Sequence, residues 1–295
     1  MKTLLVTGAN GQLGRALSRA TLLEGWEVVA LDRDALDLSD ATAIAAKVAE
    51  RPWAAVINAA AYTAVDEAED DVVAAWTINA LAPAAFAAAC ARADVPLIQV
   101  STDYVFAGDK PGAWEVDDPV APLGVYGASK LGGELAVRTA GVRHAIVRTA
   151  WVVSPDGANF VKTMLRVGAT RDTLRVVEDQ HGSPTSADDL AAALLSIATR
   201  LADDPYAPTG TFHFSNAGAT TWAGFAREIF HQSKRRGGPS PQVEGIATSD
   251  YPTPARRPAN SLLGHDAIRA AYGISPRPWE DALGDILDQL IGAPR

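Results

Sequence analysis

The sequence has very little cysteine and no excess of positive charge. Its 295 residues include one cysteine, Cys90, which excludes an intrachain disulfide framework and a cysteine-rich zinc site. Lysine and arginine number 26 against 35 aspartate and glutamate residues, so the net charge is −9. A generic nucleic-acid-binding protein carries a basic footprint instead. We therefore expect no nucleic-acid partner, although a local basic pocket for a small anion is compatible with this composition.

The sequence also lacks a long hydrophobic run. No stretch reaches about 18 apolar residues without a charge or a breaker, so we expect no membrane span. Residues 1–7 form a short apolar run that ends at Gly8, which is not the pattern of a signal peptide. With 48% hydrophobic and 21% charged residues, the composition is that of a globular protein. We expect it to be cytoplasmic, with one large or two unequal domains.

Short apolar strands alternate with helices in the first half of the chain. The predicted strands span 4–6, 28–31, 55–57, 97–100 and 145–147, and the predicted helices 12–24, 41–50, 74–93 and 129–137. Such alternation is typical of a parallel sheet that is covered on both faces. With right-handed crossovers it predicts an α/β fold, a Rossmann-type doubly wound sheet.

After about residue 150 the pattern changes, because proline and glycine become frequent between 154 and 184. A helix at 187–200 and a strand at 211–214 are expected to return to the main sheet, and 235–260 to form a cap built of loops. The predicted domains are a dinucleotide-binding domain of 1–150 plus about 171–217, and a smaller discontinuous substrate-binding domain of about 151–170 plus 218–295.

A glycine-rich loop follows the first predicted strand and has the spacing GxxGxxG over residues 8–14. Glycine permits the tight turn and lets the backbone approach a pyrophosphate, and the next helix offers free N–H groups. Three glycines alone are weak evidence, but the strand–loop–helix context predicts a dinucleotide site. The predicted cofactor contacts in this loop are Gly8, Asn10, Gly11, Gln12 and Leu13.

Asp32 ends the second predicted strand and is followed by Arg33. An acidic residue at this place binds the ribose of NAD, whereas an arginine accommodates the 2′-phosphate of NADP. The sequence therefore leaves the choice between NADH and NADPH open, and a solvated charge pair is the alternative. Small residues after the third strand would let a cofactor cross the strand ends, unless they serve tight packing alone. The further predicted cofactor contacts are Asp37, Leu38, Ala59, Ala60 and Ala61.

Tyr126 and Lys130 are four residues apart, which places them on one face of a helix. A free tyrosine has a pKa near ~10, and a nearby ammonium group lowers it by stabilising the phenolate. The pair is therefore a candidate proton donor to a carbonyl, although YxxxK alone is common by chance. Thr102 follows the fourth strand, where it could bind a substrate oxygen or cap its own backbone.

The glycine loop, a strand-end hydroxyl and YxxxK together resemble the extended short-chain dehydrogenase/reductases that modify nucleotide sugars. Within that group the chain is similar to the dTDP-4-dehydrorhamnose reductase family over nearly its whole length. The motifs that carry this narrower resemblance lie at 58–66 (NAAAYTAVD), 101–106 (STDYVF), 148–152 (RTAWV), 159–164 (NFVKTM), 179–185 (DQHGSPT) and 251–261 (YPTPARRPANS).

The resemblance implies transfer of a nicotinamide hydride to C4 of dTDP-4-dehydro-β-L-rhamnose, which gives dTDP-β-L-rhamnose. It implies that Tyr126 donates the proton, that Lys130 lowers its pKa and holds the nicotinamide ribose, and that Thr102 orients the keto oxygen.

The resemblance also implies residues that bind the substrate. Thr102, Asp103 and Trp151 would contact the sugar. Arg257 is the candidate for the diphosphate, because arginine binds phosphate in a bidentate manner. A core tryptophan and a solvated loop arginine are the alternatives for Trp151 and Arg257.

Other functions compete with this interpretation, and one of them is reduction of a different nucleotide sugar at C4. A nucleotide-sugar dehydratase needs Asp-Glu after the threonine, and Tyr104 stands in the glutamate position. A 4-epimerase shares the catalytic residues but keeps its NAD bound. A non-catalytic subunit, like the reductase-like regulatory subunit of methionine adenosyltransferase, would not need the intact catalytic set.

Some members of the family dimerise around Mg²⁺ that glutamates hold. This chain has Ala16 and Gln289 at two of those positions, which leaves Asp188 as the third ligand. Since Mg²⁺ needs several oxygen ligands, we expect no metal site, and a monomer or a metal-independent homodimer.

Overall fold

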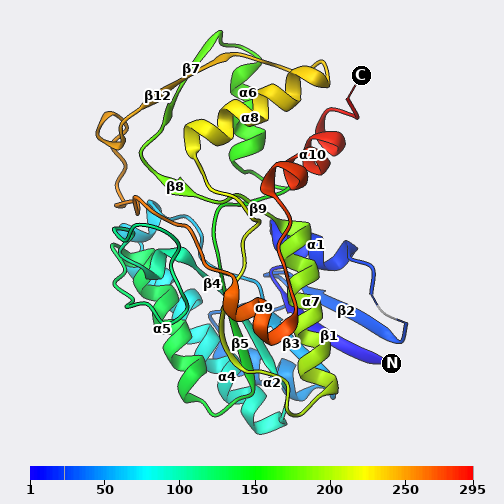
Figure 1. Cartoon of the computed structure of the whole chain (residues 1–295). Coiled ribbons are helices and arrows are strands. Elements are labelled where there is room, and N and C mark those ends of the chain that lie inside the picture. Colours follow the sequence, from blue (N-terminus) through cyan, green and yellow to red (C-terminus); the bar gives the residue numbers. More distant parts are fainter. Residues whose placement is uncertain (23, 295) are drawn as a thin grey trace.

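The computed structural model describes residues 1–22 and 24–294, and its centre is a six-stranded sheet (Figure 1). Every neighbouring pair in it is parallel. In spatial order its strands are β2 (Trp26–Leu31), β1 (Lys2–Thr7), β3 (Ala55–Asn58), β4 (Leu97–Thr102), β5 (His144–Thr149) and β10 (Gly210–His213). The order reverses between β1 and β3, and the crevice at such a reversal is where doubly wound sheets bind ligands. The predicted Rossmann-type fold is confirmed.

Helices cover both faces of this sheet because its strands are apolar on both sides. Leu4 and Val6 of β1 pack into one buried cluster, and Leu5 between them packs into another. The first cluster includes residues of α1 (Gln12–Arg19), α7 (Ala187–Asp203) and α9 (Asp266–Tyr272). The second includes residues of α2 (Ala41–Ala49), α4 (Ala82–Ala93) and α5 (Val125–Thr139).

The helical stretch Val72–Ala93 joins α3 (Val72–Trp76), the π-helical turn η2 (Thr77–Leu81) and α4. Among the described residues it is long and apolar enough to cross a membrane by length and composition, with a mean hydropathy of 1.6. It contains Pro83 and Arg92, so a search for runs without a charge or a breaker does not pick it out. Phe86, Ala87 and Cys90 are fully buried against the sheet, so this segment packs as a core helix of the domain does.

A smaller lobe lies above the strand ends in Figure 1 and has a hydrophobic core of its own. Its helices are α6 (Phe160–Gly168), α8 (Trp222–Arg235) and α10 (Trp279–Leu290). Two of its strands pair in parallel, β7 (Thr173–Val177) with β12 (Gln242–Ile246). We expected loops at 235–260. Strand β12 lies there instead, because its backbone pairs with β7, which is distant in the sequence. Short pairs link the lobes: β6 (Val152–Val153) with β9 (Thr185–Ser186), and β8 (His181–Gly182) with β11 (Thr220–Thr221).

The predicted division into two domains stays a prediction, but the contacts place two elements that bear on it. β7 lies within the predicted range 171–217 and pairs with β12 of the small lobe. α9 lies within the predicted range 218–295, and its Ile268 packs into the core beneath the large sheet. The chain therefore crosses between the lobes several times.

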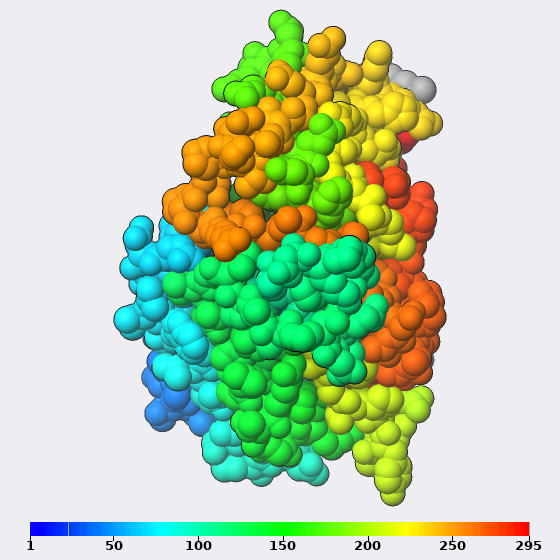
Figure 2. All heavy atoms as spheres, turned by 60° about the vertical axis from the view of Figure 1, so that its left-hand side comes forward, coloured from blue at the N-terminus to red at the C-terminus, as the bar shows by residue number. Residues whose placement is uncertain are grey.

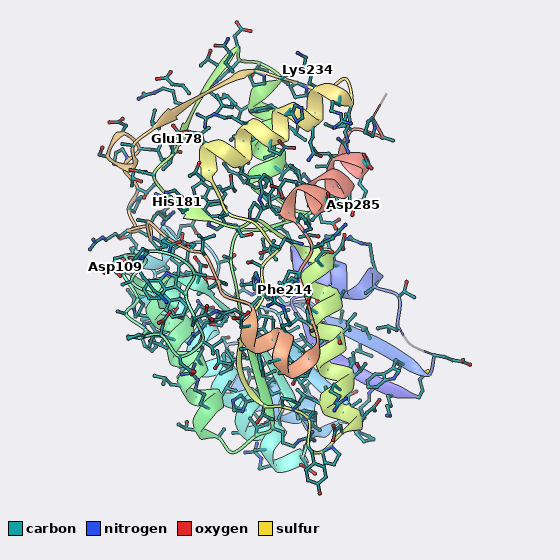
Figure 3. All side chains as sticks on the ribbon, viewed as in Figure 1. Asp109, Glu178, His181, Phe214, Lys234 and Asp285 are labelled. Carbon is teal, nitrogen blue, oxygen red and sulfur yellow. The ribbon has the colours of Figure 1, made fainter. Side chains whose placement is uncertain are left out.

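A strap of residues 251–261 runs along the boundary between the lobes, in orange in Figure 2. The backbone N–H of Asn260 donates to the carbonyl of Gly108 in the large lobe at 2.9 Å. The N–H of His181, labelled in Figure 3, donates to the carbonyl of Ala259 at 2.8 Å. The strap is thus bonded to both lobes. Three 3-10 turns, η1 (Glu67–Glu69), η3 (Asp103–Val105) and η4 (Thr248–Asp250), complete the described elements.

Candidate active site

The glycine loop packs directly against the end of β3. Gly8 has a φ of +77°, and a Cβ atom there would lie 3.1 Å from Cα of Ala60, so only glycine suits the position. A Cβ atom on Gly14 would overlap the carbonyl oxygen of Gly8. Helix α1 begins after Gly11 without a side-chain cap and with no acidic residue in its first turn. Its first N–H groups are thus available to an anion, and this cradle fits a dinucleotide pyrophosphate.

Asn10 and Asp32 meet beside this loop. The carboxylate of Asp32 accepts from Nδ2 of Asn10 at 3.2 Å and from the N–H of Ala35 at 3.0 Å. Asp32 is half-buried and Arg33 is exposed. The structure therefore places Asp32 and Arg33 at the same end of β2, and their predicted roles toward the cofactor stay predictions.

The remaining predicted cofactor residues differ in exposure. Asp37 is exposed, and hydrogen bonds from the N–H and hydroxyl of Ser39, both at 2.9 Å, lower its pKa. Leu38 is buried in the core below α2. Leu13 is also buried, in the cluster on the opposite face of the sheet. Ala59 and Ala61 flank Ala60 after β3 and are partly buried.

Gln12 connects the glycine loop to the small lobe. Its Oε1 accepts from Oγ of Ser154 at 3.0 Å and from Nδ2 of Asn159 at 2.9 Å. Its Nε2 donates to the carbonyl of Val152 at 3.4 Å. Asn159 in turn caps α6 through Lys162 N–H. The loop and the start of the small lobe are therefore held together by one side chain.

Lys130 lies one turn after Tyr126 on α5, and its ammonium group is turned toward the sheet. Its Nζ donates to the carbonyl of Val100 at 2.7 Å, and the side chain is 4% exposed. Burial lowers the pKa of Lys130 to about 8, while the charge of Glu134 acts in the opposite direction. The same carbonyl accepts from Gln99, which bonds to Asn58 at 2.8 Å. Lys130 is thus fixed to the strand ends.

Tyr126 lies at the crevice beside Thr102, Asp103 and Tyr104. Burial raises its pKa to about 12; the hydroxyl of Thr102 lowers it, and the charge of Asp103 raises it further. The ring of Tyr104 meets that of Tyr126 edge to face, with centroids 5.4 Å apart. We expected Lys130 to lower this pKa, but burial sets its direction, and the Lys130 ammonium group donates to the Val100 carbonyl.

Asp103 is a buried carboxyl at the end of β4. Its Oδ1 accepts from the Thr102 hydroxyl at 2.9 Å, and among the described residues its Oδ2 has no hydrogen-bond partner. The residue is 3% exposed, and burial raises its pKa to about 6, with the nearby hydroxyls of Ser261 and Thr102 opposing this. An unpartnered buried oxygen is costly, so Oδ2 is a ready acceptor for a ligand hydroxyl.

Trp151 and Arg257 lie on either side of the boundary between the lobes. Trp151 follows β5 with a φ of +50° and stacks on Trp222 of α8. Arg257 of the strap pairs with Asp66, Nη2 to Oδ2 at 2.7 Å, and Asp66 also accepts from Ala255 N–H at 3.0 Å. The predicted contacts of these residues with the sugar and the diphosphate stay predictions.

Sequence reasoning missed a buried charge network behind the candidate site. Glu134 is fully buried, and its carboxylate accepts from Ser101 at 2.6 Å and from Arg148 at 2.8 and 2.7 Å. Its position one turn after Lys130 was the available signal. Asn79 of η2 was also missed: it accepts from Tyr62 N–H at 2.9 Å and bonds to Ser129 of α5. These contacts fasten the β3 loop to the catalytic helix.

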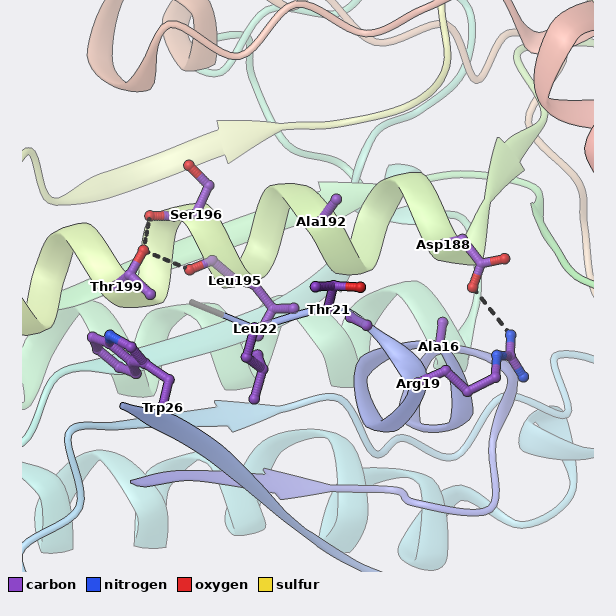
Figure 4. A pocket seen from close by; sticks show the side chains of 11 residues that line it. Ala16, Arg19, Thr21, Leu22, Trp26, Asp188, Ala192, Leu195, Ser196 and Thr199 are labelled. Carbon is purple, nitrogen blue, oxygen red and sulfur yellow. Dashed lines mark hydrogen bonds and ion pairs between the residues drawn. The ribbon is translucent and has the colours of Figure 1, made fainter. Parts of the chain in front are cut away.

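A cavity of about 710 Å³ lies elsewhere, between α1, α7 and the start of β2 (Figure 4). Ala16 and Asp188 line it, and Asp188 pairs with Arg19 at 3.0 Å. Among the described residues, no cluster of three or more His, Cys, Asp or Glu side chains could hold a metal ion. None of the predicted catalytic residues lines this cavity.

The comparisons with known proteins agree on one family. The family model for the RmlD substrate binding domain matches residues 1–291. A dTDP-4-dehydrorhamnose reductase from Sinorhizobium fredii is 43% identical over 289 residues, 98% of this chain and 97% of that protein. A solved dTDP-4-dehydrorhamnose reductase from Clostridium acetobutylicum is 38% identical with a TM-score of 0.90, covering 98% of this chain and 99% of that one.

A second solved dTDP-4-dehydrorhamnose reductase, from Bacillus anthracis, is in complex with NADP. It is 34% identical with a TM-score of 0.89, over 97% of this chain and 99% of that one. Identity of this extent over both full lengths covers the glycine loop, helix α5 and the small lobe together. The chain therefore belongs to the dTDP-4-dehydrorhamnose reductase family and is a nicotinamide-dependent oxidoreductase.

Proposed function

We propose that this enzyme reduces the C4 keto group of dTDP-4-dehydro-β-L-rhamnose to a hydroxyl, giving dTDP-β-L-rhamnose. The observation that carries the proposal is the contact of the Tyr126 ring with Tyr104, two residues after Thr102, with centroids 5.4 Å apart at the strand ends, in the crevice that also contains the glycine loop. Lys130 is fixed to Val100 in the strand that ends at Thr102. This arrangement supports a proton donor and a hydroxyl acting together on a keto oxygen beside a bound dinucleotide.

Reduction of a ketone adds a hydride to carbon and a proton to oxygen. The reduced nicotinamide, when bound, supplies the hydride. Tyr126 gives its phenolic proton to the oxygen, and its raised pKa keeps that proton in place at neutral pH. Lys130, protonated below its pKa of about 8, would hold the ribose of the nicotinamide. The Thr102 hydroxyl, which donates to Asp103 in this structure, turns to donate to the keto oxygen when the substrate binds.

The test uses purified protein, chemically prepared substrate, and NADH and NADPH in separate reactions. Asp32 and Arg33 lie together at the end of β2, so each cofactor has a candidate partner. We expect cofactor oxidation and a dTDP-rhamnose product identified by NMR. Protein that carries tightly bound NAD and interconverts C4 epimers without consuming added cofactor would identify an epimerase instead. Absence of any turnover would identify a non-catalytic binding protein.

We also infer that the enzyme is cytoplasmic and assembles without metal, as a monomer or a homodimer. Ala16 has no ligand atom, Gln289 has a neutral amide, and Asp188 already pairs with Arg19. We expect the mass in solution and the activity to be unchanged by EDTA. A halving of the mass on chelation, measured by size-exclusion chromatography with light scattering, would contradict this.

A further inference from the structure

Trp151 has a backbone conformation that a tryptophan rarely adopts. Its φ of +50° lies in the left-handed region, which L-residues with a Cβ atom avoid. Such a conformation persists only where the surroundings determine it, and it is found often at ligand sites. Trp151 lies two residues after Thr149, the last residue of β5. In the sheet, β5 pairs with β4, the strand that ends at Thr102.

The backbone around Trp151 is held by hydrogen bonds from β9. The carbonyl of Trp151 accepts from Thr185 N–H at 3.1 Å, and the Thr185 hydroxyl donates to the carbonyl of Ala150 at 2.6 Å. These bonds fix the path of the chain. They do not fix the direction of the indole ring, which depends on its side-chain contacts.

The indole ring packs against the buried cluster that contains Val105 and Phe106, and two further contacts come from the small lobe. Trp222, the first residue of α8, stacks on it with ring centroids 3.6 Å apart and planes 14° from parallel. Gly182 of β8 lies against the ring so closely that a Cβ atom there would be 2.5 Å from Cε2 of the indole. The site therefore needs an aromatic ring at 222 and no side chain at 182.

Trp222 is in turn held by the core of the small lobe. Its ring lies 4.7 Å from that of Phe160, and Phe160 stacks on Phe225 with centroids 5.4 Å apart. Phe225 meets Trp279 edge to face at 5.4 Å and is fully buried. A continuous series of aromatic contacts thus runs from the lobe interior to the indole of Trp151.

We propose that Trp222 is a positioning residue that holds Trp151 against the bound sugar nucleotide and thereby sets the affinity for it. The inference rests on the proposed function and on the predicted contact of Trp151 with the sugar. Trp222 lies on the small lobe, whereas Tyr126, Lys130 and the glycine loop lie on the large one. Its loss should therefore affect substrate binding far more than the cofactor or the proton transfer.

The kinetic test compares Trp222→Ala and Trp222→Phe with Phe230→Leu. Phe230 is buried on the same helix and packs near Gly168, so it reports loss of lobe packing alone. We expect Trp222→Ala to raise the KM for the sugar nucleotide about tenfold, which corresponds to about 1.4 kcal/mol. Trp222→Phe, which retains a ring, should restore much of this. The KM for the cofactor should stay within about twofold. An unchanged substrate KM, or equal changes in Trp222→Ala and Phe230→Leu, would overturn the proposal.

A second measurement needs no activity. Two stacked indoles couple electronically, so their circular dichroism signal should be lost in both Trp151→Phe and Trp222→Phe and kept in Trp26→Phe. Gly182→Ala should weaken it by displacing the Trp151 ring. Loss in Trp151→Phe only would show that Trp222 does not hold that ring and would overturn the proposal. If the signal behaves as expected while the enzyme does not reduce the dTDP-sugar, the proposed function fails and the pairing stands.

Discussion

Two successive turns of helix α5 bury charge in different ways. In the first turn, the ammonium group of Lys130 donates to one neutral acceptor, the Val100 carbonyl. Near it, among the described residues, one carboxylate oxygen of Asp103 has no hydrogen-bond partner. In the next turn, Glu134 is surrounded by donors from Ser101, Arg138 and Arg148. Burial shifts the pKa values of Lys130 and Asp103, whereas both carboxylate oxygens of Glu134 accept hydrogen bonds.

This difference shows how the fold stabilises a site whose buried groups are not fully hydrogen-bonded. Buried groups without full pairing lower stability but remain available to a ligand, as is typical of functional sites. The Glu134 network compensates by joining α5 to the ends of β4 and β5 through Ser101 and Arg148. We therefore expect substitutions in the first turn to change activity more than stability, and those in the second to do the reverse.

The largest expected effect is on catalysis. Tyr126→Phe keeps the ring and its contact with Tyr104 but removes the proton, so kcat should fall about 10²–10⁴-fold. The free energy of unfolding should change little. Steady-state oxidation of the reduced cofactor and urea denaturation measure the two quantities. A near-normal kcat would remove the acid role from Tyr126.

For Glu134, one turn after Lys130 on α5, we expect a larger effect on stability than on activity. Glu134→Ala leaves Arg148, which is 1% exposed, without its carboxylate partner. Removal of one member of a buried ion pair costs about 3–5 kcal/mol of unfolding free energy. Arg138→Ala is the matched control, because Arg138 is partly exposed and surface pairs contribute at most about 1 kcal/mol. Equal stability of the two variants in urea would contradict the distinction between the turns.

A pH titration tests how much the buried carboxyl of Asp103 lowers the free energy of unfolding. Its folded pKa of about 6 lies above the ordinary value near ~4, so the folded state binds the proton more tightly. Its contribution to stability is thus complete below about pH 4 and is lost as the pH rises through 6. Across this window the unfolding free energy of Asp103→Asn should gain up to about 3 kcal/mol relative to the unsubstituted enzyme. A difference that does not depend on pH would show that this carboxyl ionises normally.

The smallest expected effect concerns the choice between NADH and NADPH, which involves residues outside helix α5. Asp32→Ala removes the expected ribose acceptor and leaves Arg33, so kcat/KM with NADH should fall about tenfold more than with NADPH. Arg33→Ala is the matched variant and should shift the preference in the opposite direction. Equal losses with both cofactors would count against Asp32 as a ribose ligand.

The elements that sequence reasoning found are those with local signals. The glycine loop, Asp32 at a strand end, and Tyr126 and Lys130 at helical spacing each depend on residues close together in the chain. β12 was missed because its pairing with β7 depends on residues about 70 positions away. Arg257 was found as a phosphate candidate, but its ion pair with Asp66 could not be read from the sequence.

The sequence by itself determined the alternation of strands and helices, the dinucleotide loop and the family, because periodicity and motif spacing are properties of neighbouring residues. Tertiary structure alone decided the direction of the Tyr126 pKa, which burial raises, and the partner of Lys130. It also brought Trp222 onto Trp151 and Arg148 onto Glu134. These outcomes depend on desolvation and on contacts across the fold, which exist only once the chain has packed.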